Sequence, residues 1–527
     1  MLLLATRSRI SLRCALPAAL LLFGITTICR AGAAQAAISG PQQPNEPYRL
    51  KVTTQTAVLD VVVTDRQGHP VTNLKRDDFT IYDDKTPQTI QTFDPPPSVT
   101  HAPNPPVHST ADLDRLEPSA PVTLIVLDEI NTTFQDEAFG RYSLEQFLKH
   151  QGETLDHPTL LGAVDIKHFT LLHDYTTSKQ ELLNALHAHK VIYPEQTEGT
   201  NWQAQQYIAS FAGLLEVTQS TAGHPGHKTL LWVGRGFPPF DPTALSENDN
   251  AGLEQVLDSC VDAMRDARMV LYTLDPAGVT TEAQTADPET GFLDDPFNGE
   301  LDFSKLATAS GGHSFFGRND VDKLIAVAST EGLDFYTLSY KPSTPITDTR
   351  AFHNIRVVMK DPNLTAETRT GYYAHSPAPP EHVGSSHANR QVFDLGLAFN
   401  SAIPYDGVHF QVARSATDAD TFSVTMRSND LSWVSSKSGQ VITKITVVAA
   451  AFDAKGNMLA RAVKLSTLQD TAAAGDSAAD PTVKVNTSIA THAPATTMRL
   501  VIRDEASGRI GALSFPLSTA SGTPVAN

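Results

Sequence analysis

Leu124-Ile-Val-Leu-Asp128-Glu-Ile-Asn131-Thr132 is the stretch that decides the fold class of this chain. In it an apolar run ends abruptly in an acid, and amide and hydroxyl side chains follow. This order is typical of a buried parallel strand that delivers polar side chains to the carboxyl edge of an open α/β sheet, where ligands usually bind. The stretch therefore predicts an α/β fold and places a binding edge after Asp128.

The region around this stretch, residues 119–375, alternates apolar strand patterns with helical ones. Buried strands are predicted at 160–166, 169–173, 229–233 and 269–274, and residues 333–340 are expected to close the pattern as a last strand. The strands at 160–166 and 169–173 are expected to form a pair joined by a short turn, and Ser178 could cap the helix that follows them. Apolar residues at helical spacing fill several of the other intervals. Alternation of this length predicts a doubly wound, Rossmann-like sheet with helices on both of its faces.

All-β patterns flank the alternating region on both sides. Residues 48–95 are expected to form a small Ig-like β-sandwich, followed by a stiff proline-rich linker at 96–118. A second linker is expected at 376–390 and a second β-sandwich at 391–518, with a strand at 393–399. The last residues, 519–527, are expected to be a mobile tail.

The N-terminus, residues 1–36, is predicted to be a signal peptide. Arginines precede an apolar run, and a small-residue stretch ends at Ala36. An uncleaved anchor is the alternative, although fourteen apolar residues are short for a membrane span. Cleavage would make the protein secreted or periplasmic. It would also leave Cys260 as the only remaining cysteine, and Cys260 is expected to be a core residue. No later segment is long and apolar enough to span a membrane.

The chain is acidic, with a formal net charge of −18 that becomes more negative once the arginine-bearing leader is removed. Such a surface repels phosphate backbones, so no nucleic-acid partner is expected. Acidity alone does not create a site for divalent cations.

Several motifs beyond Asp128 resemble one protein family. They are Lys228-Thr-Leu-Leu-Trp-Val-Gly-Arg-Gly-Phe237, Leu271-Tyr-Thr-Leu-Asp275-Pro and Tyr336-Thr-Leu-Ser-Tyr340. As a set they resemble the acidobacterial VWFA-related proteins, over about residues 50–375. The resemblance implies a von Willebrand factor A (VWA) fold and, by analogy, the binding of an extracellular or cell-envelope protein.

The same resemblance implies a metal-ion-dependent adhesion site of pattern D-x-S-x-S, completed by a threonine and an aspartate from later loops. Asp128 and Thr132 match its first and last positions, and Thr200 matches the distant threonine loosely. Ile130 stands at the middle serine position, Asn131 is one residue out of phase, and Arg235 lies where an acid is required. Because Mg²⁺ and Ca²⁺ need several oxygen ligands, no cofactor is expected and the site is predicted to be degenerate.

Alternative roles exist for these polar residues. Asp128 could cap the next helix or accept hydrogen bonds from loop amides, and Arg235 could pair with it. Asp275 precedes a proline, which favours a turn over a ligand role. The pairs His187-Ala-His189 and His224-Pro-Gly-His227 lack further ligands, so solvated loop histidines are expected rather than a zinc site.

The function that we predict is non-enzymatic protein binding. The partner-binding edge would comprise six residues: Asp128, Asn131, Thr132, Thr200, Arg235 and Asp275. No nucleophile elbow, P-loop or dinucleotide fingerprint is present in the sequence. The alternatives are a secreted hydrolase acting on polysaccharide or peptide, with an active site that no motif reveals, and a purely structural spacer in the envelope.

Overall fold

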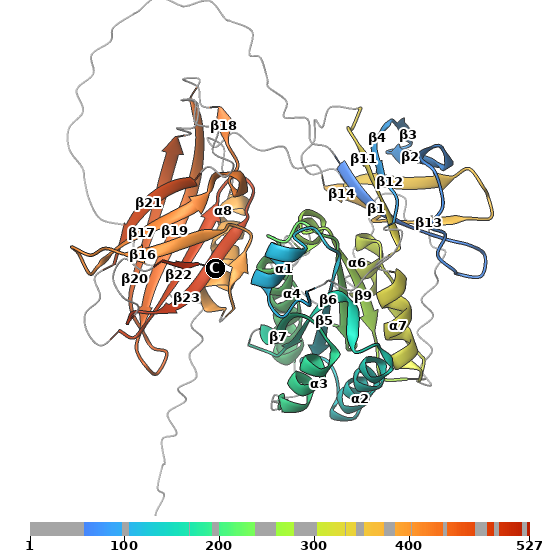
Figure 1. Ribbon diagram of the computed structural model, residues 1–527, viewed down its shortest axis with the longest axis horizontal. Coiled ribbons are helices and arrows are strands. Elements are labelled where there is room, and N and C mark those ends of the chain that lie inside the picture. The colour runs from blue at the N-terminus through green and yellow to red at the C-terminus, as the bar shows by residue number, and fades with distance from the viewer. Residues whose placement is uncertain are drawn as a thin grey trace, which may run out of the picture. The chain divides into compact units, whose positions relative to one another are not determined.

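The computed structural model describes most of the chain between residues 57 and 526. The described ranges are 57–96, 105–167, 169–191, 200–237, 260–278, 303–331, 334–343, 352–373, 385–401, 403–435, 440–469, 482–489, 495–518 and 524–526. They form a mixed α/β chain with several sheets, one of which contains parallel strands (Figure 1). The predicted signal peptide lies outside the described residues.

The parallel strands belong to a six-stranded sheet in the middle of the chain, with the strand order β10-β9-β8-β5-β6-β7. Its strands are β5 (Val122–Asp128), β6 (Thr154–Val164), β7 (Phe169–Ser178), β8 (Lys228–Val233), β9 (Met269–Leu274) and β10 (Ser314–Phe315). All neighbours pair in parallel except β6 and β7, which form the predicted antiparallel pair. The apolar stretch before Asp128 is therefore a central parallel strand, as predicted.

Helices lie before, between and after several of these strands along the chain. They are α1 (Thr110–Leu116), α2 (Phe134–His150), α3 (Lys179–Ala188), α4 (Thr200–Ser220), α6 (Phe303–Ser310) and α7 (Val321–Glu331). The hydroxyl of Ser178 caps α3, as expected, by accepting from the amide of Glu181. Thr133 caps α2 in the same way, so Asp128 does not cap this helix, which was one of its two alternative roles.

Successive side chains of β5 enter two different cores, because alternate residues of a strand point to opposite faces of the sheet. Leu124 and Val126 pack in one core with α4 and α6. Ile125 and Leu127 pack in the other with α2, α3 and α7. All seven residues of β5 are buried, which explains why the run from Leu124 to Leu127 is continuously apolar up to the acid.

Two four-stranded sheets make up a separate β module, which has its own core. Its strands are β1 (Ala57–Thr64), β2 (Phe79–Asp83), β3 (Thr86–Gln88), β4 (Ile90–Asp94), β11 (Phe335–Tyr340), β12 (Phe352–Met359), β13 (Thr365–Glu367) and β14 (Gly371–Tyr373); a 3₁₀ turn, Arg76–Asp78, precedes β2. β11 pairs with β1 and β4, not with the parallel sheet. The prediction that 333–340 closes the alternating region is therefore wrong, because an apolar strand pattern does not specify which sheet it joins.

The C-terminal region contains two further sheets whose side chains share one core. Its elements are α8 (Ser385–Asn400), β15 (Tyr405–Asp406), β16 (Phe410–Arg414), β17 (Thr421–Arg427), β18 (Val434–Ser435), β19 (Val441–Phe452), β20 (Met458–Gln469), β21 (Thr482–Ser488), β22 (Thr497–Asp504), β23 (Ile510–Pro516) and β24 (Val525–Ala526), with a 3₁₀ turn at Ser428–Asp430. β24 pairs with β16, although 519–527 was expected to be a mobile tail.

The strand predicted at 393–399 is wrong, because these residues belong to helix α8. Their apolar residues alternate, which favours a strand. Arg499 overrides this local preference: its Nε and Nη2 donate to the carbonyl oxygen of Ala398 at 2.9 and 2.6 Å. A cation that satisfies carbonyls at a helix C-terminus stabilises the helix, and this one comes from a strand about one hundred residues later.

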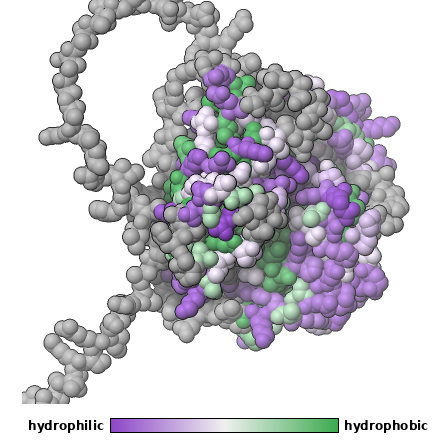
Figure 2. Space-filling view, turned by 60° about the vertical axis from the view of Figure 1, so that its left-hand side comes forward, coloured by the Kyte–Doolittle hydropathy of each residue, from purple (hydrophilic) through white to green (hydrophobic). Residues whose placement is uncertain are grey.

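Hydrophobic and hydrophilic residues are interspersed on the face seen in Figure 2. The described residues contain no helix that is both long and apolar enough to cross a membrane.

Candidate functional site

The carboxyl ends of five parallel strands lie side by side at one edge of the six-stranded sheet. The register pairs Asp128 with Val164, Val233 with Leu274, and Leu274 with Phe315. The loops that carry Asp128, Asn131, Thr132, Arg235 and Asp275 therefore start at this edge, as predicted. Thr200 is the first residue of α4, but its side chain lies outside the described residues.

Asp128 is fully buried, and N–H groups surround its carboxylate. Oδ1 accepts from the amides of Ile130 and Asn131 at 3.0 and 3.1 Å. Oδ2 accepts from the amide of Gly236 at 2.9 Å and from the indole Nε1 of Trp232 at 3.1 Å. The side-chain amide of Asn131 adds a contact of 3.2 Å to Oδ2. The expected alternative, in which loop amides bind Asp128, is the arrangement that the structure shows.

Gly234 lets the β8 loop approach Asp128 closely. Its φ is +155°, and a Cβ atom there would lie 2.2 Å from the Cβ of Asp128 and 2.9 Å from Oγ1 of Thr132. A side chain of any kind would therefore collide with Asp128. A metal site of the expected kind would need an aspartate near here, but an aspartate in place of Gly234 has no room.

These residues do not fit a Mg²⁺ or Ca²⁺ ion. A carboxylate has about four lone-pair sites, and five N–H donors already occupy those of Asp128. The side chain of Ile130 is buried in the apolar core and offers no ligand atom. Oγ1 of Thr132 and Oδ1 of Asn131 are buried without a hydrogen-bond partner among the described residues, but two neutral oxygens do not bind a hard divalent cation.

Arg235 forms an ion pair with Asp275, with Nε 3.5 Å from Oδ2. It does not pair with Asp128, which was one of its predicted alternatives. Asp275 also accepts from the amide of Ala277 through Oδ1, so it starts a turn as its proline predicted. Because Arg235 is 46% exposed, its guanidinium can reach a partner as well as Asp275.

Two exposed phenylalanines, to which no sequence pattern pointed, lie at the same edge. Phe134 begins α2 and is 62% exposed, and Phe316 follows β10 directly and is 52% exposed. Sequence could have distinguished them from buried phenylalanines only if the ends of α2 and β10 had been predicted to the exact residue. Exposed aromatic and arginine side chains are the types that contribute most to protein–protein binding.

Of the four histidines in the two pairs, His187 is exposed as expected, whereas the other three are buried or half-buried. His224 and His227 are 2% and 3% exposed, respectively. His189 is half-buried, and its Nε2 lies 2.6 Å from Oε1 of the buried Glu129. Glu129 follows Asp128 directly, so His189 balances a second buried acid at the strand end.

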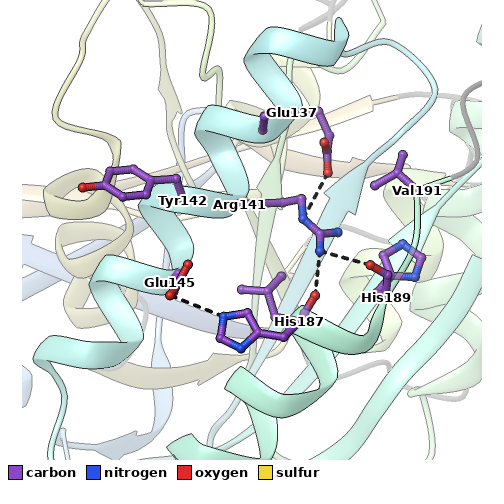
Figure 3. A pocket seen from close by; sticks show the side chains of 9 residues that line it. Glu137, Arg141, Tyr142, Glu145, His187, His189 and Val191 are labelled. Carbon is purple, nitrogen blue, oxygen red and sulfur yellow. Dashed lines mark hydrogen bonds and ion pairs between the residues drawn. The ribbon is translucent and has the colours of Figure 1, made fainter.

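A cavity of about 430 Å³ lies beside this ion pair (Figure 3). Arg141 reaches from α2 across it and donates to the carbonyl oxygens of Leu186 and His189 at 2.6 and 3.2 Å. Glu145 lies 3.3 Å from His187 on its other side. The acidic and basic side chains of these walls are paired with one another, so the cavity does not favour either a negatively or a positively charged ligand.

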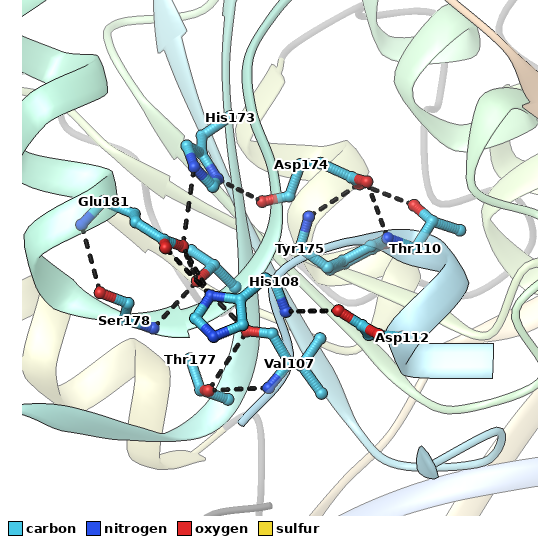
Figure 4. Close-up of polar contacts among 11 residues, drawn as sticks. Val107, His108, Thr110, Asp112, His173, Asp174, Tyr175, Thr177, Ser178 and Glu181 are labelled. Atoms are coloured by element: carbon cyan, nitrogen blue, oxygen red, sulfur yellow. Dashed lines mark hydrogen bonds and ion pairs between the residues drawn. The ribbon is translucent and has the colours of Figure 1, made fainter. Parts of the chain in front are cut away.

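The end of the predicted linker is bound to the α/β region rather than extended as a free spacer (Figure 4). The backbone amide and hydroxyl of Thr110 donate to Asp174 at 2.7 and 2.6 Å. Nδ1 of His108 lies 3.0 Å from Oε1 of Glu181, and Thr177 donates its amide to the carbonyl of Val107. The residues after 106 therefore belong to the α/β region structurally, and helix α1 begins there.

Comparison with known proteins gives two structural similarities. Proximal thread matrix protein 1 from the mussel byssus aligns with 45% of this chain and 50% of its own, at 14% identity and a TM-score of 0.26. Manganese-loaded TRAP from Plasmodium vivax, a VWA-domain protein, aligns with 47% of this chain and 92% of its own, at 9% identity and a TM-score of 0.25. Scores of this size carry no assignment of function. The alignment spans only half of the mussel protein.

No family model and no curated protein matches the chain. The resemblance to the acidobacterial VWFA-related proteins therefore remains a prediction.

Proposed function

We propose that this chain is a secreted, non-enzymatic binding protein in which a VWA-like, doubly wound domain lies in sequence between two β-sandwich modules. The strand order, the cores on both faces of the sheet and the row of aligned carboxyl ends support a VWA-like arrangement. The partner would be an extracellular or envelope protein that binds the edge where β5, β8, β9 and β10 end.

The observation that carries the proposal is the saturation of Asp128. In a metal-dependent adhesion site this acid holds a cation, and the cation in turn binds an acid of the partner. Here N–H groups of the protein itself take the place of the cation. Partner binding at this edge is therefore proposed to be independent of metal.

The contacts would come from the exposed side chains of the edge. Asp128 and Thr132 are too deeply buried to touch a partner, so they support the loops. Phe134, Phe316 and Arg235 reach solvent and could form a small apolar and cationic contact area. This area would suit a partner surface that presents an acid between apolar side chains.

The test combines cation titration with capture from an extracellular and envelope fraction. We expect no heat of binding with Mg²⁺, and we expect saturable capture of one protein that EDTA does not reduce. The double variant Phe134→Ala/Arg235→Ala should lose capture, whereas the matched control Leu465→Ser, at an exposed position of β20, should keep it.

Two results would reject this function. Tight stoichiometric Mg²⁺ binding that Asp128→Ala abolishes would show that the edge is a working metal site. Turnover of a polysaccharide or peptide in a substrate panel would favour the hydrolase alternative instead.

A further inference from the structure

A second set of ligand-type side chains lies in the β module. Asp83 ends β2, Asp84 follows it in the turn to β3, and His353 lies on β12, the strand beside β2. One ligand atom from each lies within 4.8 Å of the other two. We propose that Asp83, Asp84 and His353 bind a divalent transition-metal ion, for which Zn²⁺ is the representative probe.

The distances suit a small tetrahedral ion. Nδ1 of His353 lies 2.7 Å from Oδ2 of Asp84 and 3.5 Å from Oδ1 of Asp83. Zn²⁺ binds nitrogen and oxygen ligands at about 2.1 Å, which places ligands about 3.4 Å apart in a tetrahedron. The three atoms need only small side-chain adjustments to reach such positions, and a water molecule would complete the coordination.

Strand pairing holds two of the ligands on one face. Asp83 is paired with Ile355, and His353 lies two residues before Ile355 on the same strand. Because side chains two residues apart share a face, the imidazole and the Asp83 carboxylate point to the same side of the sheet. This arrangement depends on backbone register and does not require a bound ion.

Two tyrosine hydroxyls orient the buried acid. Tyr340 and Tyr372 donate to Oδ2 of Asp83 at 2.8 and 2.9 Å, which leaves Oδ1 toward His353. The ring of Tyr372 also stacks on His353 with an interplanar angle of 13°. Outer partners of this kind hold metal ligands in place.

The ligand types favour a transition-metal ion over Mg²⁺, and the exposure of Asp84 lets the ion reach the site from solvent. An imidazole with two carboxylates suits Zn²⁺ and other transition metals, whereas Mg²⁺ prefers oxygen ligands alone. The side chain of Asp83 is 5% exposed, that of His353 16% and that of Asp84 47%. The site is therefore supported from beneath by the module and open to solvent at Asp84.

The test is a Zn²⁺ titration of the full chain without a histidine tag, followed by calorimetry, with thermal unfolding as a second measurement. We expect one site per chain and a higher unfolding temperature with Zn²⁺, and no such effect with Mg²⁺. His353→Gln and Asp84→Asn should each weaken Zn²⁺ binding at least tenfold and remove the temperature rise. Tyr372→Phe should weaken binding by about 10- to 100-fold.

The matched control is His69→Gln. His69 lies 3.4 Å from Asp65, so it forms an exposed pair of histidine and aspartate without the second acid. Zn²⁺ binding should be unchanged in this variant. Asp84 has a φ of +47°, which asparagine also adopts readily, so Asp84→Asn should fold even if His353→Gln does not.

Absence of Zn²⁺ binding in the parent chain, or unchanged affinity in Asp84→Asn, would overturn the proposal. Neither result bears on the edge around Asp128, whose test uses Mg²⁺ and partner capture.

Discussion

The indole Nε1 of Trp232 donates a hydrogen bond of 3.1 Å to Oδ2 of Asp128, and both side chains are buried. Trp232 is paired with Val126, two residues before Asp128, so the indole and the carboxylate share a face of the sheet. In the proposed metal-independent edge, the tryptophan makes one of the contacts that a cation would otherwise make.

Asp128→Asn should destabilise the chain. The new amide would keep one acceptor oxygen and would direct its NH₂ group at donors that now bind the other oxygen. Leaving buried donors unsatisfied costs about 1–3 kcal/mol each, so a loss of about 2–4 kcal/mol is expected in urea unfolding. Asp275→Asn, at a half-buried ion pair, should change stability by less than about 1 kcal/mol. Equal effects of the two variants would contradict this account.

Gly234→Ala should also destabilise the chain, because its Cβ would collide with Asp128 and the φ of +155° disfavours L side chains. Forced repacking of this kind typically costs about 1–3 kcal/mol. Gly396→Ala is the matched comparison: this glycine lies inside α8, and no atom lies within 4 Å of the added methyl group. That variant should gain about 0.5–1 kcal/mol, since alanine favours helix. Thermal unfolding measures both variants, and Gly234→Ala should lower the unfolding temperature whereas Gly396→Ala should raise it.

His224 should make the chain sensitive to acid. Burial lowers the pKa of its imidazole from 6.5 to about 4, and the neutral ring binds the carbonyl of Ala120 through Nε2. Because the pKa of His224 is lower in the folded chain than in the unfolded chain, the unfolded chain binds the proton first as the pH falls. The contribution of neutral His224 to the free energy of unfolding is therefore complete above pH 6.5 and is lost as the pH falls toward 4. At about 1.4 kcal/mol per pKa unit, the loss is on the order of 3 kcal/mol.

The measurement is the difference in unfolding free energy between the parent and His224→Gln, followed from pH 7 to pH 4. Subtraction removes the contributions of other groups, including His409, whose raised pKa acts in the opposite direction. A flat difference for His224→Gln would show that this histidine does not titrate differently on folding.

Arg499→Met should destabilise α8. The guanidinium also donates to the carbonyl of Ile403 at 3.0 Å, so its removal leaves several buried acceptors without donors. Burial lowers the pKa of Arg499 to about 10, which still leaves it charged at neutral pH. Loss of such a buried partner costs about 3–5 kcal/mol. Urea unfolding measures this cost, and circular dichroism should show reduced helix content if the helix end frays.

The sequence predicted the elements of the α/β region because each depends on local information. A buried strand before Asp128, the antiparallel pair of β6 and β7, and the cap at Ser178 all follow from neighbouring residues. The grouping of the polar residues after β5, β8 and β9 follows from the parallel direction of these strands.

Several of the errors involve partners that are distant in sequence. The donors that saturate Asp128 come partly from Trp232 and Gly236, over a hundred residues away, and no spacing rule connects them. Helix α8 depends on Arg499, and the membership of β11 depends on β1. Local patterns specify the type of an element, whereas its neighbours and the state of a buried acid depend on the assembled fold.

The β module is discontinuous in sequence, and this has a consequence for synthesis and folding. β1 and β4 precede the α/β region, but the strand that lies between them, β11, follows it. Bringing such remote segments together closes a long loop, which carries an entropic cost and slows folding. The first strands to leave the ribosome must therefore wait for residues beyond 334 before they can pair with β11. A chain truncated within the α/β region would expose these strands unpaired, so quality control should remove such fragments quickly.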